Sequence, residues 1–161
     1  MKSSRRYWLF KSEPSCFSFC DLEKRPEGIE PWDGVRNYQA RNFLRDEIQP
    51  GDGVLFYHSS ISRPAVVGTA VVVRGGYPDS TALDPENDAY DPRSTPEAPI
   101  WYRVDVRYEK PLVRQVTLEE IKQQPLLAGM ELLRRSRLSI LPVTGAEWEV
   151  IIRLGGIVEE A

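Results

Sequence analysis

The tryptophan at position 32 lies in the segment Pro31-Trp32-Asp33-Gly34, whose composition is typical of a turn. A turn can hold an indole ring over a cavity instead of within packed layers, and such a ring is a stacking platform for a planar ligand. The same residues are equally consistent with a tryptophan that covers the hydrophobic core. Trp32 is therefore the first candidate for a binding role, with a structural role as the alternative.

Short polar side chains are expected at the ends of predicted strands around this tryptophan: Ser12, Asn37, His58 and Ser59. A nucleobase has a π face and an edge of hydrogen-bond donors and acceptors. A site that reads a base therefore needs an aromatic ring together with polar groups. The sequence contains both kinds of residue, and we hypothesise that they converge in space.

Several enzyme classes lack their motifs in this sequence. No glycine-rich loop ends in Gly-Lys-Ser or Gly-Lys-Thr, and no G-x-G-x-x-G follows a predicted strand, which excludes the common nucleotide-dependent enzymes. Cys16 and Cys20 are separated by three residues and have no second pair, so they do not indicate a zinc site. His58 is the only histidine, and without a G-x-S-x-G elbow it is more typical of a hydrogen-bonding wall residue than of a hydrolase triad.

Lys11 and Glu13 provide the remaining catalytic alternative. A lysine desolvated beside a carboxylate can act as a base or a nucleophile. Because these two residues are close only in sequence, a solvated ion pair is the simpler interpretation.

Composition and charge limit the function further. The chain has 161 residues, of which 41% are hydrophobic and 28% charged, as expected for one globular domain with its own core. Its 21 Lys and Arg residues against 24 Asp and Glu residues give a net charge of -3, so it has no overall basic field. Binding nucleic acid would therefore require a local basic rim around a specific pocket.

The sequence shows no sign of a secretory or membrane segment. The apolar stretch from Tyr7 to Phe10 ends at Lys11, whereas a secretory core needs about 7 to 15 apolar residues. The longest aliphatic run elsewhere, Ala70 to Val73, is far shorter than the roughly 20 residues that span a bilayer. We expect a cytoplasmic protein with reduced thiols and no membrane partner.

The hydrophobic pattern predicts a curved, mostly antiparallel sheet with helices packed around it. Aromatic and β-branched runs indicate strands, and helical spacing with capping residues indicates helices. The expected strands are 7–10, 54–57, 65–74, 100–108 and 148–154, and the expected helices are a turn capped by Ser18, 37–47, one capped by Thr117, and 130–135. Residues 75–99 hold five prolines and six acidic residues and are expected to form an irregular excursion from the core.

Four strings of residues resemble the EVE domain family in the same order. They are Tyr7-Trp8-Leu9-Phe10-Lys11-Ser12-Glu13-Pro14, WDGVRNYQARNF from Trp32 to Phe43, Gly51-Asp52 leading to Phe56-Tyr57-His58-Ser59, and Leu138-Ser139-Ile140 with Pro142-Val143-Thr144. The resemblance covers nearly the whole chain, so residues 1–161 are expected to form a single EVE domain. It implies an α+β, PUA-like fold, a small mixed and mostly antiparallel β-barrel flanked by short helices.

The resemblance also implies a function. EVE domains are grouped with the YTH readers of methylated adenine, and members are known or proposed to hold a modified base, notably methylated or hydroxymethylated cytosine. By comparison with YTH readers, the candidate pocket residues here are Lys11, Ser12, Trp32, Asn37, Tyr57, His58 and Ser59. The candidate phosphate-positioning rim consists of Arg36, Arg41, Arg134, Arg135 and Arg137.

We therefore expect a non-catalytic reader, without cofactor or metal, that takes one flipped, modified base of DNA or RNA into a barrel pocket. Two alternatives remain open at this point. One is a small hydrolase of modified nucleosides that uses Lys11 and Glu13, which the related ASCH domains make conceivable. The other is an RNA-binding module of the PUA type.

Overall fold

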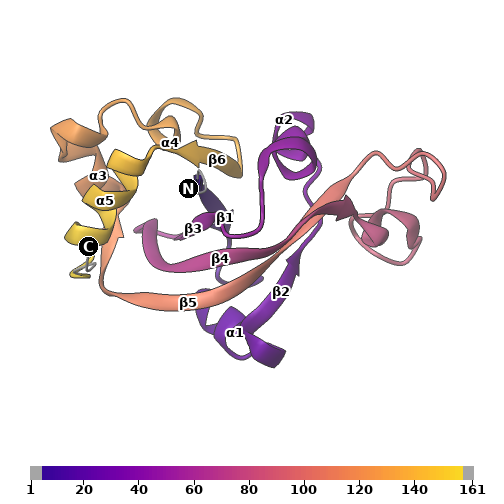
Figure 1. Cartoon of the computed structure of the whole chain (residues 1–161), viewed down its shortest axis with the longest axis horizontal. Helices are drawn as coiled ribbons and strands as arrows, with labels where there is room; N and C mark the ends of the chain where they lie inside the picture. The colour runs from indigo at the N-terminus through magenta and orange to yellow at the C-terminus, as the bar shows by residue number, and fades with distance from the viewer. Residues whose placement is uncertain (1–4, 158–161) are drawn as a thin grey trace.

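The structure is a computed structural model that describes residues 5–157. Six strands form one sheet in the order β2-β5-β4-β3-β1-β6 (Figure 1). The strands are β1 (Tyr7–Ser12), β2 (Ile29–Trp32), β3 (Gly53–His58), β4 (Ala65–Pro78), β5 (Tyr102–Thr117) and β6 (Ile140–Val143). Only the pair β1 and β3 is parallel, and the other neighbours are antiparallel. The expected α+β class and mostly antiparallel sheet are confirmed.

The expected barrel is wrong, because the sheet of the described residues is open. Its two edges are β2 and β6, each only four residues long. Pro31 in β2 and Pro142 in β6 lack the N–H that a further strand would need, as is typical of edge strands. The sheet still curves strongly, since β4 and β5 are long and several register shifts interrupt their pairing (Figure 1).

Short helices surround the sheet. They are α1 (Phe19–Glu23), α2 (Tyr38–Asn42), α3 (Leu118–Gln123), α4 (Glu131–Arg134) and α5 (Gly145–Leu154), and α2 continues into a π-helical turn, η2 (Phe43–Glu47). Three 3-10 turns complete the elements: η1 (Pro26–Gly28), η3 (Ser80–Leu83) and η4 (Pro125–Leu127). Ser18 caps α1 and Thr117 caps α3, as the sequence predicts.

Two local expectations are corrected. Residues 148–154 form part of α5 instead of a strand, because Thr144 and Glu147 make a capping box and Trp148, Ile151 and Ile152 share one buried helical face. Trp32 is the last residue of β2, so it ends an edge strand and does not sit inside a turn.

The core lies between the sheet and these helices. Trp8, Leu9 and Phe10 of β1 are fully buried beside Leu55 and Phe56 of β3, because central strands covered on both faces bury successive side chains. This burial fixes β1 and β3 as a rigid pair. The ends of both strands, which carry most of the candidate site residues, are therefore held in a defined register.

The excursion begins later than its composition suggests, since β4 continues to Pro78. Beyond it, residues 79–101 consist mainly of turns and lie away from the centre of the sheet (Figure 1). The segment is nevertheless attached: the Trp101 indole is 2% exposed and donates to the Asp91 carboxylate at 2.7 Å.

Candidate functional site

A cleft of about 480 Å³ lies beside Trp32. We call it the Trp32 cleft. Its walls come from the end of β1, the turn before α1, β2 and the loop that follows β2. The residues that line it are Lys11, Ser12, Glu13, Cys16, Phe17, Arg25, Glu30, Pro31, Trp32, Asp33, Gly34, Val35, Arg36 and Ser139. Its volume falls within the roughly 300 to 1,000 Å³ typical of small-molecule sites.

Aromatic packing fixes the position of the indole in this cleft. Trp32 lies 5.2 Å from the ring of Phe10, 6.2 Å from Phe17 and 5.5 Å from Phe56, measured between ring centroids. These tilted and edge-to-face contacts are favourable arrangements for aromatic rings. Since Trp32 remains partly exposed, the core supports one side of the ring while the residue also lines the cleft. Trp32 thus both packs against the core and borders a cavity, which are the two roles considered from the sequence.

The end of β1 brings Lys11 and Ser12 into the same cleft as Trp32. The Ser12 hydroxyl donates to the backbone carbonyl of Phe17 and so connects β1 to the turn that carries Phe17. The Lys11 ammonium donates to the Ser136 carbonyl at 2.7 Å. Burial lowers the pKa of Lys11 below its usual value.

The charged groups of the Trp32 cleft are balanced in sign: Lys11, Arg25 and Arg36 face Glu13, Glu30 and Asp33. Glu30 pairs with Arg25 at 3.0 Å, and burial is the main cause of a raised pKa at Glu30. Burial also raises the pKa of Asp33. A neutral, polar heterocycle fits such a wall better than a strongly charged ligand does.

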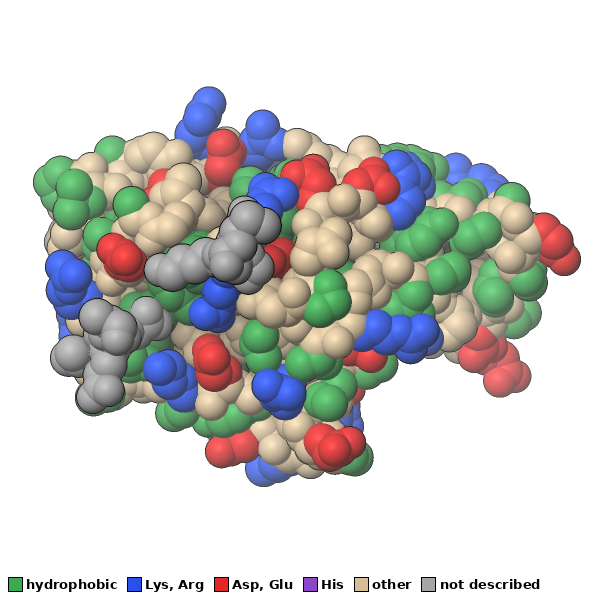
Figure 2. All heavy atoms as spheres, in the orientation of Figure 1, with side chains coloured by type: hydrophobic (Ala, Val, Ile, Leu, Met, Phe, Trp, Pro, Cys, Tyr) green, Lys and Arg blue, Asp and Glu red, His purple; other side chains and the backbone are tan. Residues whose placement is uncertain are grey.

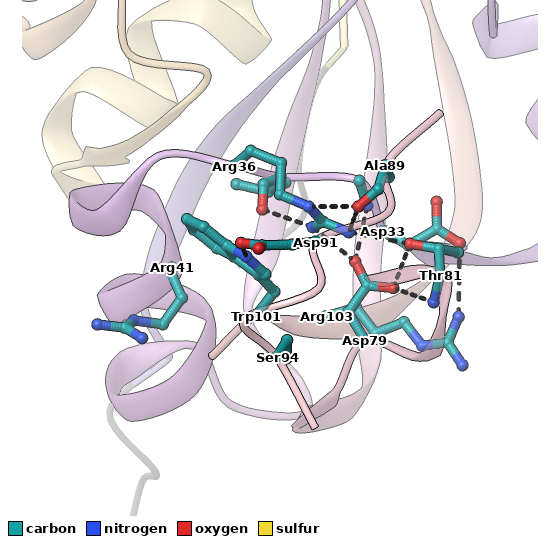
Figure 3. Close-up of polar contacts among 12 residues, drawn as sticks. Asp33, Arg36, Arg41, Asp79, Thr81, Ala89, Asp91, Ser94, Trp101 and Arg103 are labelled. Carbon is teal, nitrogen blue, oxygen red and sulfur yellow. Dashed lines mark hydrogen bonds and ion pairs between the residues drawn. The ribbon is translucent and has the colours of Figure 1, made fainter. Parts of the chain in front are cut away.

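The loop after β2 is held by a hydrogen-bond network centred on Arg36, which itself lines the cleft (Figure 3). Arg36 donates to the buried Asp79 carboxylate at 3.0 Å, to the Thr81 hydroxyl at 3.1 Å, and twice to the Ala89 carbonyl at 2.7 and 2.9 Å. Asp79 also accepts from the backbone N–H of Gly34 at 2.9 Å. The excursion thereby fixes one wall of the Trp32 cleft.

The other candidate pocket residues lie elsewhere. Asn37 caps α2, with its side-chain oxygen accepting from the Ala40 N–H at 3.0 Å. His58 Nε2 accepts from the Phe19 N–H at 3.1 Å, and burial lowers the pKa of His58. The structure therefore gathers Lys11, Ser12 and Trp32 in one cleft and gives Asn37 and His58 contacts that hold the fold.

Tyr57 and Ser59 line a second cleft, of about 450 Å³, together with Arg137. We call it the Arg137 cleft. It is adjacent to the Trp32 cleft, because Lys11, Glu13 and Ser139 line both. Tyr57 and Ser59 are predicted pocket residues that lie outside the Trp32 cleft but line the cleft next to it.

Most of the five candidate rim arginines contact other residues of the chain. Arg36 is used internally, as described above, and Arg41 donates to the Ile100 carbonyl at 2.7 Å. Arg134 and Arg135 both pair with Glu131, at 3.6 and 3.1 Å. Over the face that Figure 2 shows, basic and acidic side chains are interspersed. Four of the five arginines thus have partners within the chain, and the basic rim stays a prediction.

Sequence reasoning missed several residues that line the Trp32 cleft: Cys16, Phe17, Arg25, Glu30 and Ser139. Phe17 and Arg25 flank α1, and the Arg25 guanidinium lies 5.2 Å from the centre of the Phe17 ring. Glu30 could have been found, since it lies two residues before Trp32, on the same side of a two-residue strand repeat.

The catalytic alternative receives no geometric support. Within the described residues, Lys11 donates to Ser136 and forms no ion pair with Glu13. Cys16 and Cys20 are free and exposed. Among residues 5–157, no three His, Cys, Asp or Glu side chains gather in a way that could hold a metal ion. In the same range, no helix combines the length and apolar character needed to cross a membrane.

Comparison with known proteins relates this geometry to a family. The family model described as the EVE domain matches residues 6–154. Mouse thymocyte nuclear protein 1 is 39% identical over 170 residues, covering 95% of this chain and 75% of that protein. An uncharacterized protein of the yeast Schizosaccharomyces pombe is 43% identical over 163 residues, covering 93% of this chain and 68% of that protein.

Solved structures agree with the sequence matches. The crystal structure of human thymocyte nuclear protein 1 in complex with DNA containing 5-methylcytosine is 37% identical with a TM-score of 0.89, covering 96% of this chain and 99% of that one. A hypothetical protein from Leishmania major is 44% identical with a TM-score of 0.90, covering 95% and 96%. An ASCH protein from Zymomonas mobilis, 12% identical with a TM-score of 0.55, shares the fold alone.

Proposed function

Because the chain belongs to the EVE domain family, we propose that it binds DNA carrying a modified cytosine and takes that base into the Trp32 cleft. The observation that carries the proposal is the cleft itself. A partly exposed indole borders a hollow of about 480 Å³ in a chain that closely resembles a relative solved with 5-methylcytosine DNA. The proposed role is binding, not catalysis.

The chemistry of the cleft supports a flipped pyrimidine. The base ring stacks on Trp32, whose position is set by Phe10 and Phe56. Stacking on an aromatic side chain is worth about 1 to 3 kcal/mol per base. Ser12 lines the same cleft and binds the edge of the base.

The methyl or hydroxymethyl group contributes the selectivity. In a fitted pocket, one additional methyl contact is worth about 1 to 3 kcal/mol, which corresponds to roughly 10- to 200-fold discrimination. Extruding a base from a duplex costs a few kcal/mol. Single-stranded or mismatched targets should therefore bind more tightly than fully paired ones.

The test is a titration with oligonucleotides that differ at one position only: cytosine, 5-methylcytosine or 5-hydroxymethylcytosine. We expect the modified forms to bind at least about tenfold more tightly. Trp32→Leu, which keeps apolar packing but removes the stacking face, should abolish most of this affinity. Tyr90→Ala alters an exposed aromatic residue outside the cleft and serves as the matched control.

Equal affinities for modified and unmodified cytosine would overturn the proposal. The same titration with RNA oligonucleotides compares the two polymers, and a preference for RNA would contradict the DNA part of it. Incubation with modified nucleosides followed by mass spectrometry checks the remaining part, since a binding protein leaves them unchanged.

A further inference from the structure

The Arg137 cleft adjoins the Trp32 cleft at the end of β1, because Lys11, Glu13 and Ser139 line both. The parallel pairing of β1 with β3 places Lys11 beside Tyr57 and Ser12 beside His58, which brings the two strand ends together. An oligonucleotide whose base enters the Trp32 cleft can therefore place its neighbouring nucleotide in the Arg137 cleft.

The charge of the Arg137 cleft is net positive, because Lys11 and Arg137 face a single carboxylate, Glu13. Arg137 differs from its neighbours. Arg134 and Arg135 are both paired with Glu131, whereas no carboxylate of the described residues pairs with Arg137. Its guanidinium keeps its donors for a ligand outside the chain.

Lys11 is also suited to an anion. Its ammonium has three N–H donors, of which the Ser136 carbonyl accepts one at 2.7 Å. No carboxylate of the described residues pairs with it. A phosphate would restore the electrostatic stabilisation that burial removes from this ammonium.

The remaining lining residues include both hydroxyl-bearing and apolar side chains. Ser59, Ser60 and Ser136 provide hydroxyls, and Pro64, Leu118 and Leu132 provide apolar surface. Lys, Arg and Ser side chains are the usual partners of nucleic-acid phosphates, whereas apolar surface accommodates a sugar or base. This combination suits a nucleotide better than a free inorganic anion.

We propose that the Arg137 cleft binds the nucleotide next to the inserted base, with Lys11 and Arg137 on the phosphate that joins the two. This inference rests on the proposed function and extends it by a second subsite. It also gives Tyr57 and Ser59 a role at the flanking nucleotide instead of at the modified base.

The test measures the affinity of single-stranded oligonucleotides that contain one 5-methylcytosine as a function of salt. Arg137→Gln should weaken binding roughly threefold to tenfold. It should also reduce the slope of log K against log salt by about 0.7 to 1. The loss should be equal for methylated and unmethylated oligonucleotides, because a phosphate contact carries no information about the base. Arg153→Gln removes an exposed arginine of α5 that lines neither cleft and should change neither quantity.

A methylphosphonate substitution locates the contact. Replacing one phosphate next to the 5-methylcytosine by the uncharged analogue should weaken binding to the unsubstituted protein more than Arg137→Gln does, because it removes the partner of both Lys11 and Arg137. In the Arg137→Gln variant, where only Lys11 remains, the same replacement should weaken binding less than it does in the unsubstituted protein. Additive losses at both flanking positions, or an unchanged salt slope in the variant, would overturn the second subsite. Loss of methyl selectivity in the unsubstituted protein, with the Arg137 effect intact, would instead count against the modified-base site alone.

Discussion

Replacing Arg36 by methionine tests the view that the excursion fixes one wall of the Trp32 cleft. The Arg36 guanidinium connects the loop after β2 to the Asp79 carboxylate and the Ala89 carbonyl. The carboxyl group of Asp79 is fully buried, whereas the side chain of Arg36 is 22% exposed. Methionine keeps most of the length and apolar contact of the arginine but removes every donor.

The size of the effect follows from these contacts. Removing one partner of a buried ion pair costs about 3 to 5 kcal/mol. Asp79 retains three donors, from the Gly34 N–H, the Thr81 N–H and the Thr81 hydroxyl, so the lower end of the range applies. We expect a loss of about 3 kcal/mol, which for a chain of this length lowers the Tm by roughly 6 to 12 °C.

Thermal and urea unfolding measure this loss, with Arg45→Met as the matched control. Arg45 pairs only with its neighbour Asp46 on the surface, so its substitution should cost less than about 0.5 kcal/mol. Arg36→Met should also weaken binding of 5-methylcytosine oligonucleotides, because Arg36 lines the Trp32 cleft and holds the loop after β2. A Tm decrease no larger than that of the control would refute the reasoning.

The dependence of stability on pH gives a second measurement of the same network. Burial raises the pKa of Asp79, but hydrogen bonds from Thr81, Gly34 and Arg36 outweigh it and hold the pKa below its usual value. The resulting stabilisation is present above the unfolded pKa of about 3.9 and is lost as the pH falls through the folded pKa. In the Arg36→Met variant, acid unfolding should begin at a higher pH.

Three further outcomes are expected. Burial lowers the pKa of His58 in the folded protein, so the contribution of the neutral imidazole to the free energy of unfolding should be fully present above about pH 6.5. It should be lost as the pH falls through the folded pKa, and His58→Gln should remove this part of the pH dependence in urea titrations. Gly68→Ala would place a Cβ 2.2 Å from the aromatic ring of an α1 side chain and should cost about 1 to 3 kcal/mol, whereas Gly129→Ala meets no atom within 4 Å; equal unfolding midpoints would contradict this packing. Alkylation of Cys16, which lines the Trp32 cleft, should slow when a 5-methylcytosine oligonucleotide is added, while the rate at Cys20, outside the cleft, should stay constant; parallel protection of both thiols by peptide mass mapping would count against binding in the cleft.

Local signals account for what the sequence predicted correctly. Ser18 and Asp21 lie three residues apart and form the capping box that starts α1. The buried run from Val54 to Tyr57 is bounded by glycines and by the polar His58, so its strand could be recognised without knowledge of its neighbours.

The errors arise where distant contacts decide the structure. Pro31 and Trp32 were expected in a turn, yet they belong to β2, because an edge strand tolerates a proline that has no N–H. The contact of Arg36 with Asp79 could not be predicted, because Asp79 is 43 residues away and no local pattern reveals that pair. Residues 148–154 were expected to form a strand, although Thr144 and Glu147 already marked a helix start.

The candidate site was predicted in part for the same reason. Lys11, Ser12 and Trp32 end strands whose register is set by a buried core, and the structure brings them to one cleft. The side chains of Asn37 and His58 accept hydrogen bonds from backbone N–H groups. Residue type alone does not distinguish this structural role from ligand binding.

The structure of this protein bound to a single-stranded oligonucleotide with one 5-methylcytosine tests the central claim most directly. We predict that the methylated ring lies parallel to the Trp32 indole within the cleft, with the two ring centroids less than about 7 Å apart. A complex in which that base remains stacked in the oligonucleotide, with no base beside Trp32, would contradict it.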